Sequence, residues 1–449
     1  MKKDPYVISE DTIREPPSTL LGKLKFLGPG FILSASIVGS GELIATTILG
    51  AKAGFAALWI ILVSCLMKVA VQLEFGKHTI LTGETVMQAF NKLPGVRFGK
   101  GKWTVWIIFF MVSLKIVQLG GMLGGAVVIL NKLFAGVSIT VWALIVAVVV
   151  ASLIFRGNYS IVEKGSLVMI GLFTVLTFIS LYFVQYTPFA FSFSEILNGF
   201  QFNLSDEVIG VAIGAFGITG VASDEIIAYN YWCIEKGYAA YAGPPDNSEA
   251  RKKRASGWIN TMYVDAIFAM VIYTTVTVTF YLLGSAILYN RGEIPQGNQV
   301  IDTLALIYTQ SLGDGVKNVY LVGAFFVLFS SVYATLAFWT RLFPDIFAQL
   351  GWINFFDLQG RKKLIALISW TVPFAWAFMY LYIELPVLMV LFGGVVGSLM
   401  LFVVVFGALH FKYGRIQLLP SGGFYNTAFW ISVISIVGVG VYGVVKVFF

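Results

Sequence analysis

Long apolar stretches recur along nearly the whole chain, and they limit its possible folds more than any other feature. A window of roughly 20 apolar residues can cross a bilayer as a helix, the form in which a single segment satisfies its own backbone hydrogen bonds in lipid. Only 12% of the 449 residues are charged and 58% are hydrophobic, which lies outside the range of soluble domains. Eleven windows occur, at residues 28–52, 55–76, 103–130, 137–155, 162–184, 207–232, 258–289, 316–342, 363–383, 385–409 and 424–448. The sequence therefore predicts an all-α, polytopic membrane protein with eleven transmembrane helices.

The links between the windows differ in basic charge, and this difference predicts the orientation. Of the 30 Lys and Arg, 23 fall on the side of the N-terminus and five on the other side, while Lys68 and Lys115 lie inside windows. Cytoplasmic links carry the excess of Lys and Arg. We therefore expect a multi-pass protein of the plasma (inner) membrane with its N-terminus cytoplasmic and its C-terminus extracytoplasmic. The net charge of +7 follows from this topology, so membrane lipids are the expected partner and nucleic acid is not.

The first and sixth windows are each interrupted by small and acidic residues. A helix centre with glycines and a carboxylate is costly in lipid unless the helix unwinds against a cavity or an ion. Two such breaks at corresponding positions indicate a transporter's binding site. The polar residues are Gly39, Ser40, Gly41 and Glu42 in the first window and Ser223, Asp224 and Glu225 in the sixth.

The two interrupted windows cross the membrane in opposite directions, and both contain the pattern Ser-x-Glu-(Leu/Ile)-Ile-Ala. This arrangement predicts an inverted 5+5 repeat followed by one added helix. The expected divisions are a cytoplasmic N-terminal segment (1–27), a first repeat (28–184), a second repeat (185–409) with a cytoplasmic loop at 233–257, and helix 11 (410–449).

The breaks offer oxygen ligands, which suit Mg²⁺, Mn²⁺ or Ca²⁺. Copper and zinc are disfavoured, because no His, Cys or Met stands beside either break in the sequence. An alternative is that the acids only cap the half-helices that follow them. Two adjacent acids on one helix are also not expected to face one centre. The candidate metal ligands are Gly39, Ser40, Glu42, Thr219, Ser223, Asp224 and Glu225.

Lys115 lies in the middle of the third window, with Gln118 three residues later. An ammonium group at that depth either extends to the membrane surface, loses its proton, or pairs with a carboxylate of the cavity. We expect the pairing, with Lys115 and Gln118 in a coupling or charge-balancing role. The two histidines, His78 and His410, lie near helix ends, so the sequence predicts no histidine proton relay at mid-membrane.

Several of these stretches resemble the NRAMP family of divalent metal transporters. The resemblance rests on Gly28-Pro29-Gly30-Phe31 before a helix break, on VQLEFGKHTILTGET at 71–85, on the eleven windows and on the break in the sixth. It implies the fold of the amino acid-polyamine-organocation superfamily, with alternating access around a metal site at mid-membrane.

The chain departs from the family at the metal-binding motifs. Where the family has Asp-Pro-Gly-Asn, this chain has Gly39 to Glu42, and where it has Met-Pro-His-Asn, this chain has Ala222 to Glu225. The departures are similar to the NRAMP-related magnesium transporter branch, in which loss of the methionine accompanies hard-ion transport and loss of proton coupling.

The sequence thus predicts a secondary transporter of a hard divalent cation, Mg²⁺ or Mn²⁺, by alternating access. Transport without proton coupling is the favoured mechanism, and a proton carried by one of Glu42, Asp224 and Glu225 is the alternative. The metal is the transported substrate, and no cofactor is expected. An organic substrate such as an amino acid or amine on the same scaffold is the alternative, and a sensor that does not transport is a third reading. No catalytic motif indicates an enzyme, and the two cysteines do not indicate a disulfide framework.

Overall fold

The computed structural model describes residues 4–39, 41–155, 159–200, 202, 204–246, 248–295, 299–415 and 422–448. Most of these residues are helical. The described part has one pair of strands, β1 (Arg97–Phe98) and β2 (Gly101–Lys102), which pair antiparallel. The fold is therefore an all-helical bundle, as the apolar windows predict.

The helices differ widely in length. The first half contains η1 (Glu10–Thr12), α1 (Leu20–Leu24), α2 (Pro29–Ile37), η2 (Gly41–Thr46), α3 (Thr47–Ala53), η3 (Gly54–Ala57), α4 (Leu58–Met67), α5 (Val69–Thr82), α6 (Val86–Phe90), α7 (Trp103–Leu114), α8 (Ile116–Leu133), α9 (Ile139–Ile154), α10 (Tyr159–Val184) and α11 (Phe193–Asn198). The second half contains α12 (Asp206–Ile218), α13 (Ser223–Lys236), α14 (Tyr238–Ala242), α15 (Glu249–Leu283), η4 (Gly284–Tyr289), α16 (Val300–Leu312), η6 (Asp314–Val316), α17 (Lys317–Gln349), α18 (Leu358–Ile383), α19 (Pro386–His410), η7 (Phe411–Arg415) and α20 (Gly423–Phe448).

Eight helical stretches in the described residues are long and apolar enough to cross a membrane. They are Gly41–Thr82, Trp103–Leu133, Asp206–Lys236, Glu249–Tyr289, Asp314–Gln349, Leu358–Ile383, Pro386–Gly414 and Gly423–Gly443. Three shorter apolar helices are Ile139–Ile154, Phe173–Val184 and Val300–Leu312. The structure thus describes a multi-pass chain, and the count of eleven spans stays a prediction.

Two parts of the second half differ from what the sequence predicts. The expected loop at 233–257 is largely helical, because α13 continues to Lys236 and α15 begins at Glu249, where the Ser248 hydroxyl caps the helix by accepting from the Arg251 amide. Arg251 is buried and donates to the carbonyls of Ile80 and Leu81 at the end of α5. The windows also missed α16, whose apolar residues are interspersed with polar ones.

Helical structure is interrupted at two places in the middle of the bundle. α2 ends at Ile37 and helix resumes at Gly41, while α12 ends at Ile218 and α13 begins at Ser223. Gly220, between the latter two, has a φ of 59°, and a Cβ there would lie 2.7 Å from the Cα of Cys65. Glycine is therefore required at this close approach to α4.

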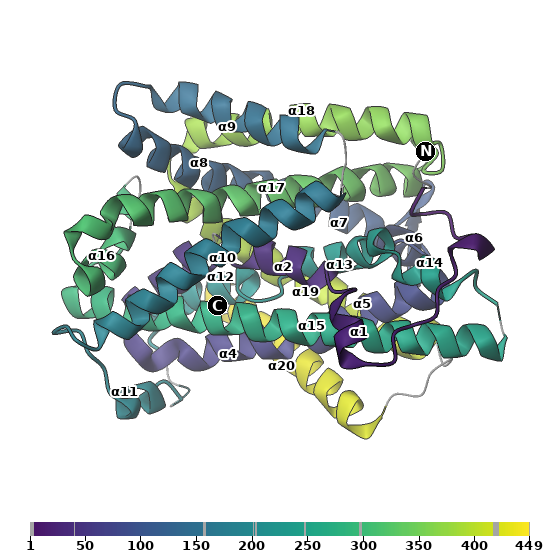
Figure 1. Ribbon diagram of the computed structural model, residues 1–449, viewed down its shortest axis with the longest axis horizontal. Helices are drawn as coiled ribbons and strands as arrows, with labels where there is room; N and C mark the ends of the chain where they lie inside the picture. The colour runs from purple at the N-terminus through teal and green to yellow at the C-terminus, as the bar shows by residue number, and fades with distance from the viewer. Residues whose placement is uncertain are drawn as a thin grey trace.

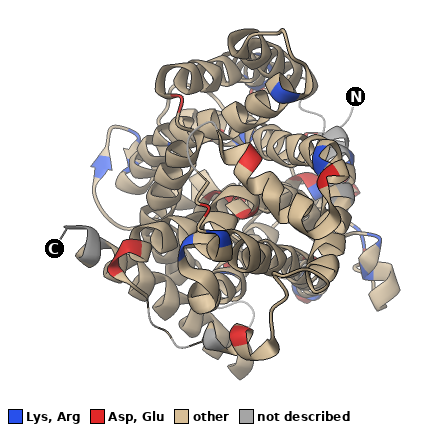
Figure 2. Cartoon of the chain, turned by 90° about the vertical axis from the view of Figure 1, so that its left-hand side faces the viewer, with Lys and Arg blue, Asp and Glu red and all other residues tan. Residues whose placement is uncertain are grey.

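The interrupted helices lie inside a shell of long helices. In Figure 1, α2, α12 and α13 run between α17 and α15, and α2 contacts both of these long helices. α8 packs against α17, α18 and α19, and α12 packs against α19. In the end-on view of Figure 2 most of the chain is uncharged, with a few acidic segments near the middle. The two breaks and α8 therefore share one interior region.

The start of α2 is fixed by a carboxylate from α15. The amides of Gly28 and Gly30 donate to Asp265, at 2.8 Å and 2.6 Å, and the Tyr229 hydroxyl donates to it at 3.1 Å. The first turn of a helix has unpaired N–H groups and a partial positive charge, so an anionic acceptor satisfies both. This contact gives a physical reason for the Gly-Pro-Gly sequence, since Pro29 at the first helical position needs no acceptor.

The N-terminal segment, residues 4–27, packs against the end of the bundle. The Tyr6 hydroxyl donates to Glu235 of α13 at 2.9 Å, and Arg341 of α17 donates to the same carboxylate at 2.9 Å. Asp4 pairs with Arg361 of α18 at 2.6 Å. The segment therefore bridges α13, α17 and α18.

Replacing Gly30 by alanine tests the close packing at the start of α2. An added Cβ would lie 2.7 Å from the Asp265 carbonyl oxygen and 2.8 Å from the Ala269 Cβ, so the helix or α15 has to shift. We expect Gly30→Ala to lower the stability by about 1–3 kcal/mol, measured by thermal unfolding of the purified protein. Gly210→Ala is the matched control, because Gly210 also lies in a helix but has nothing within 4 Å of an added Cβ. Equal unfolding temperatures for the two variants would contradict the proposed anchor.

Candidate functional site

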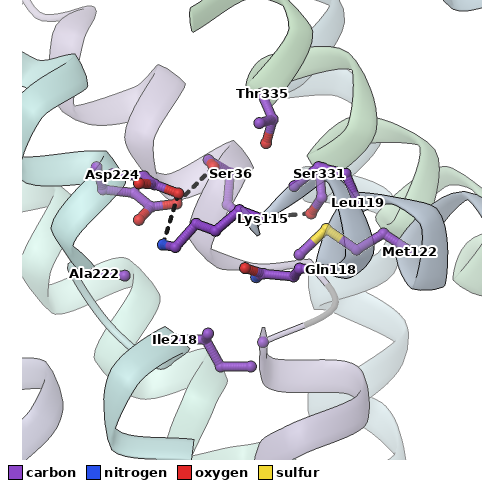
Figure 3. Close-up of a pocket in the computed structure, with 12 residues that line it drawn as sticks. Ser36, Lys115, Gln118, Leu119, Met122, Ile218, Ala222, Asp224, Ser331 and Thr335 are labelled. Atoms are coloured by element: carbon purple, nitrogen blue, oxygen red, sulfur yellow. Dashed lines mark hydrogen bonds and ion pairs between the residues drawn. The ribbon is translucent and has the colours of Figure 1, made fainter. Parts of the chain in front are cut away.

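A cavity lies between the two breaks and one face of α8. Its volume is about 390 Å³, including space open to solvent. Its walls are Ser36, Gly41, Lys115, Gln118, Leu119, Met122, Ile218, Ala222, Asp224, Glu225, Ser331 and Thr335. We call it the central cavity (Figure 3). An adjoining hollow shares Ser36, Asp224, Glu225 and Thr335 with it and continues past Trp232 and Phe338. Both spaces therefore open on the same two carboxylates.

The two carboxylates stand in the first turn of α13. Asp224 and Glu225 follow Ser223, the first helical residue, and Ala222 before it has an extended backbone. Both acids line the central cavity, contrary to the expectation that neighbours on a helix cannot share a centre. They can do so here because α13 begins at Ser223, so no earlier turn of the same helix separates either side chain from the break. The positive end of the α13 dipole also favours their negative charge.

Lys115 neutralises one of these acids. It lies where α7 meets α8, is 1% exposed, and donates from Nζ to Asp224 Oδ2 at 2.8 Å. The same ammonium lies 3.4 Å from the Ser223 hydroxyl. In Figure 3 the Lys115 side chain crosses the cavity toward Asp224. The expected pairing of Lys115 with a carboxylate of the cavity is thus present.

Three buried oxygen atoms of the cavity walls accept no hydrogen bond within the described part of the chain. They are Gln118 Oε1, Asp224 Oδ1 and Glu225 Oε2. The other Glu225 oxygen accepts from the Ser36 hydroxyl at 2.8 Å. Buried acceptors are nearly always satisfied in folded proteins, and an unpaired carboxylate oxygen is the most costly kind. The three atoms therefore form a set of acceptors suited to a cation or a hydrogen-bond donor that enters the cavity.

Glu42 lies apart from this set. Its side chain is fully buried, and Oε1 accepts from the Thr277 hydroxyl at 3.0 Å and the Gly220 amide at 3.3 Å. Oε2 is 3.5 Å from the Gly39 amide, and Glu42 does not line the central cavity. The structure therefore does not bring Glu42 together with Glu225. Glu42 instead joins both breaks to α15.

The carbonyl of Thr219, another candidate ligand, is already bonded. It accepts from the Lys68 ammonium at 2.7 Å and from the Ser64 hydroxyl at 2.8 Å. A metal would have to displace both donors. Gly39 is tightly packed, because an added Cβ would overlap the Ser331 hydroxyl. Ser40 lies outside the described residues.

Sequence reasoning missed the contribution of Met122. It lies seven residues after Lys115 and four after Gln118, so all three share one face of the helical run that α7 and α8 form. Figure 3 shows its thioether on the wall beside Gln118. A sulfur atom is therefore present in the cavity although Ala222 stands at the break. The helical spacing from Lys115 was the signal that could have found it.

Ser36, Ser331 and Thr335 were also missed. Ser36 lies in the last turn of α2, and the other two lie four residues apart on α17. Hydroxyls at this spacing on a long apolar helix face the same side. They add hydroxyl oxygens to the walls that α2 and α17 form.

Comparison with known proteins identifies the family of this chain. Residues 30–446 match the sequence model of the family described as "Natural resistance-associated macrophage protein-like". The chain belongs to this Nramp family. Among curated proteins it is similar to metal transporter Nramp3 of Arabidopsis thaliana, 24% identical over 79% of this chain and 65% of that protein. It is also similar to divalent metal cation transporter MntH of Bradyrhizobium diazoefficiens, 23% identical over 70% of this chain and 66% of that protein.

Solved structures show the same fold. A manganese transporter of Eremococcus coleocola has a TM-score of 0.66 and 14% identity, with 97% of this chain and 90% of that chain covered. Mhp1, a nucleobase-cation-symport-1 family transporter, has a TM-score of 0.60 and 11% identity, with 98% and 95% covered. The Nramp chain therefore shares its architecture with transporters of different substrates. The fold alone does not separate a metal ion from an organic substrate.

The pairing of Lys115 with Asp224 can be tested by a double-mutant cycle. Lys115→Met leaves a buried carboxylate unpaired, and Asp224→Asn leaves a buried ammonium unpaired. Each change should therefore cost about 3 kcal/mol of stability. The double variant should recover most of that loss, since neither charge is then left alone. Thermal unfolding of the three variants measures the coupling.

Lys252→Met is the matched control, because Lys252 pairs with the largely exposed Glu249. Its loss should stay below about 1 kcal/mol. A double variant that loses the sum of the two single losses would contradict the coupling of Lys115 and Asp224.

Proposed function

We propose that this Nramp-family protein carries a divalent metal cation, Mg²⁺ or Mn²⁺, across the membrane by alternating access. The observation that carries the proposal is the set of unpartnered oxygens of Gln118, Asp224 and Glu225 in one buried cavity. Carboxylate and amide oxygens are the ligands of hard divalent cations. The names of the relatives, which describe metal and manganese transporters, support the same substrate class.

The proposed metal ligands are Asp224, Glu225, Gln118 and the hydroxyl of Ser36. Water fills the remaining positions, as Mg²⁺ prefers. Met122 adds one thioether, which attracts softer ions. Oxygen donors outnumber it, so we propose that Mg²⁺ and Mn²⁺ both enter the site.

The remaining candidate ligands have a supporting role in this proposal. Glu42, Thr219 and Gly39 hold the two broken helices in place through the contacts described above. Ser223 positions the Lys115 ammonium. These residues shape the site without contributing a ligand in this conformation.

Lys115 makes a second contribution through charge. The ionisable side chains that line the central cavity are two acids and one lysine, which leaves one net negative charge when all are ionised. Two uncompensated carboxylates would resist reorientation through a poorly solvated interior. We propose that the fixed ammonium lets the empty carrier return without a proton, so that transport is not coupled to protons.

The membrane arrangement completes the proposal. We propose eleven spans in an inverted 5+5 repeat plus one helix, with the N-terminus cytoplasmic. The similarity of the chain to transporters of related architecture supports this arrangement. The proposed setting is a plasma (inner) membrane.

An organic cation is the second candidate substrate. One net negative charge and several acceptors in the central cavity also suit a primary amine, whose ammonium donates three hydrogen bonds. Thermal unfolding in the presence of metals, amines and amino acids separates the two candidates. Stabilisation by amines alone would favour the second.

Metal uptake into proteoliposomes tests the first proposal. We expect the purified protein to move Mn²⁺ and Mg²⁺ into vesicles, and Glu225→Gln to reduce the initial rate at least about tenfold because it removes a charged ligand. Glu249→Gln is the control, because Glu249 is exposed and lies outside the cavity. Purified protein that moves neither ion would rule out the metal proposal.

The absence of proton coupling can be measured in the same vesicles with a trapped pH dye. Because Lys115 supplies a fixed positive charge, Mn²⁺ uptake should leave the internal pH unchanged under a matched membrane potential. Protein-free vesicles give the baseline. Metal-dependent acidification that persists in Lys115→Met would show that a carboxylate carries the proton instead.

A further inference from the structure

Lys68 is a buried cation that the proposed transport site does not use. It lies where α4 meets α5 and is fully buried. Its ammonium donates to the carbonyl of Phe216 at 2.8 Å and to that of Thr219 at 2.7 Å. The Phe216 ring lies 4.9 Å from the same nitrogen. A lysine held so far from water needs an explanation beyond surface charge.

The two carbonyls belong to the end of α12. The last turn of a helix carries unpaired carbonyls and a partial negative charge, and here it stops inside the protein at the second break. The Ser64 hydroxyl donates to the same two carbonyls, at 3.1 Å and 2.8 Å, and the Thr219 hydroxyl donates to Ser64 at 2.9 Å. Four oxygen atoms therefore gather around the end of α12.

Only neutral oxygens hold this ammonium in the described part of the structure. No carboxylate there forms an ion pair with Lys68, whereas Lys115 has Asp224. Carbonyl and hydroxyl oxygens at a helix end are the ligands with which membrane proteins hold a free alkali cation. Neutral oxygen ligands favour a monovalent ion over a divalent one, and the nearby carboxylates of Glu42 and Glu225 act on the ammonium through space without contacting it.

We propose that the end of α12 is a monovalent-cation site and that the ammonium of Lys68 is its covalently attached occupant. The site is separate from the central cavity, because its oxygens come from Phe216, Thr219 and Ser64. With the lysine in place, the break between α12 and α13 keeps its shape without a free ion. Without it, Na⁺, K⁺ or ammonium ion fills the vacancy.

A purely structural lysine is the competing explanation. In that case its hydrogen bonds matter and its charge does not, so shortening the side chain destabilises the protein equally in every salt. The two explanations differ in whether small cations restore the loss. The comparison needs no transported substrate, so its result does not depend on metal transport.

Lys68→Ala in detergent is compared with wild type by thermal unfolding in NaCl, KCl, ammonium chloride and choline chloride at equal ionic strength. Choline is too large for the vacancy. We expect Lys68→Ala to unfold at lower temperature than wild type in choline, and at least about 3 °C higher in one of the small cations than in choline. The gain should saturate with cation concentration, and wild type should be indifferent to the cation.

Ser64→Ala is the matched control. It removes a hydrogen bond to the same carbonyls but leaves the ammonium in place, so its unfolding temperature should fall equally in all four salts. Equal rescue of Ser64→Ala and Lys68→Ala would indicate a general salt effect and overturn the proposal.

Lys68→Ser guards against a failure of the alanine variant to fold, since its short polar side chain also leaves room for an ion. A folded Lys68→Ala or Lys68→Ser protein that is indifferent to the cation would overturn the proposal. Failure of both variants to fold in every salt would also overturn it, because a free ion would then not replace the ammonium.

Discussion

Backbone groups released in the middle of an apolar bundle have no water to bond, and the interior of this protein is arranged around that constraint. Asp265 satisfies the start of α2, and Glu42 of the first break accepts from an amide of the second break. At the second, Lys68 and Ser64 satisfy the end of α12. These polar groups keep the two broken helices in place. Among the described residues that line the central cavity, Gln118, Asp224 and Glu225 each keep one unpaired oxygen, and the two acids stand out because an unpaired carboxylate oxygen is costly to bury.

The sequence predicted the class of fold because its cause is local. A window of apolar residues becomes a helix in lipid whatever it contacts, so the long helices fall close to the predicted windows. The end of α18 at Ile383 and the start of α19 at Pro386 follow from proline chemistry in the same way. The helical start of α15 was missed because its first turns are polar, and their stability comes from contacts such as that of Arg251 with α5.

The site was only partly predictable, because tertiary contacts decide which residues line the cavity. Glu42 and Glu225 occupy equivalent places in the repeated pattern, yet one faces Thr277 and the other faces the cavity. The sequence pattern predicts where along its helix each Glu lies, but it does not predict which residue of another helix the side chain contacts. The contribution of α8 was visible in part, since Lys115 and Gln118 were singled out and Met122 lies on the same face. The sequence places Lys68 only inside an apolar window, because its contact with the end of α12 joins residues about 150 positions apart.

The two ends of α2 are held with unequal strength. The backbone of its first turn is bound to a carboxylate by short hydrogen bonds, whereas the backbone carbonyls near its last turn accept from Ser331 and Ser330 over 3.3 Å and 3.4 Å. The last turn also reaches α13 through the side chain of Ser36, which donates to Glu225 at 2.8 Å. A helix of nine residues is about 14 Å long, so a tilt of about 10° about the fixed end moves the other end by about 2 Å. That displacement is close to the length of a metal–oxygen bond. A small tilt of α2 would therefore be enough to move the hydroxyl of Ser36 into or out of the central cavity. The glycines of the break would accommodate the change in backbone direction.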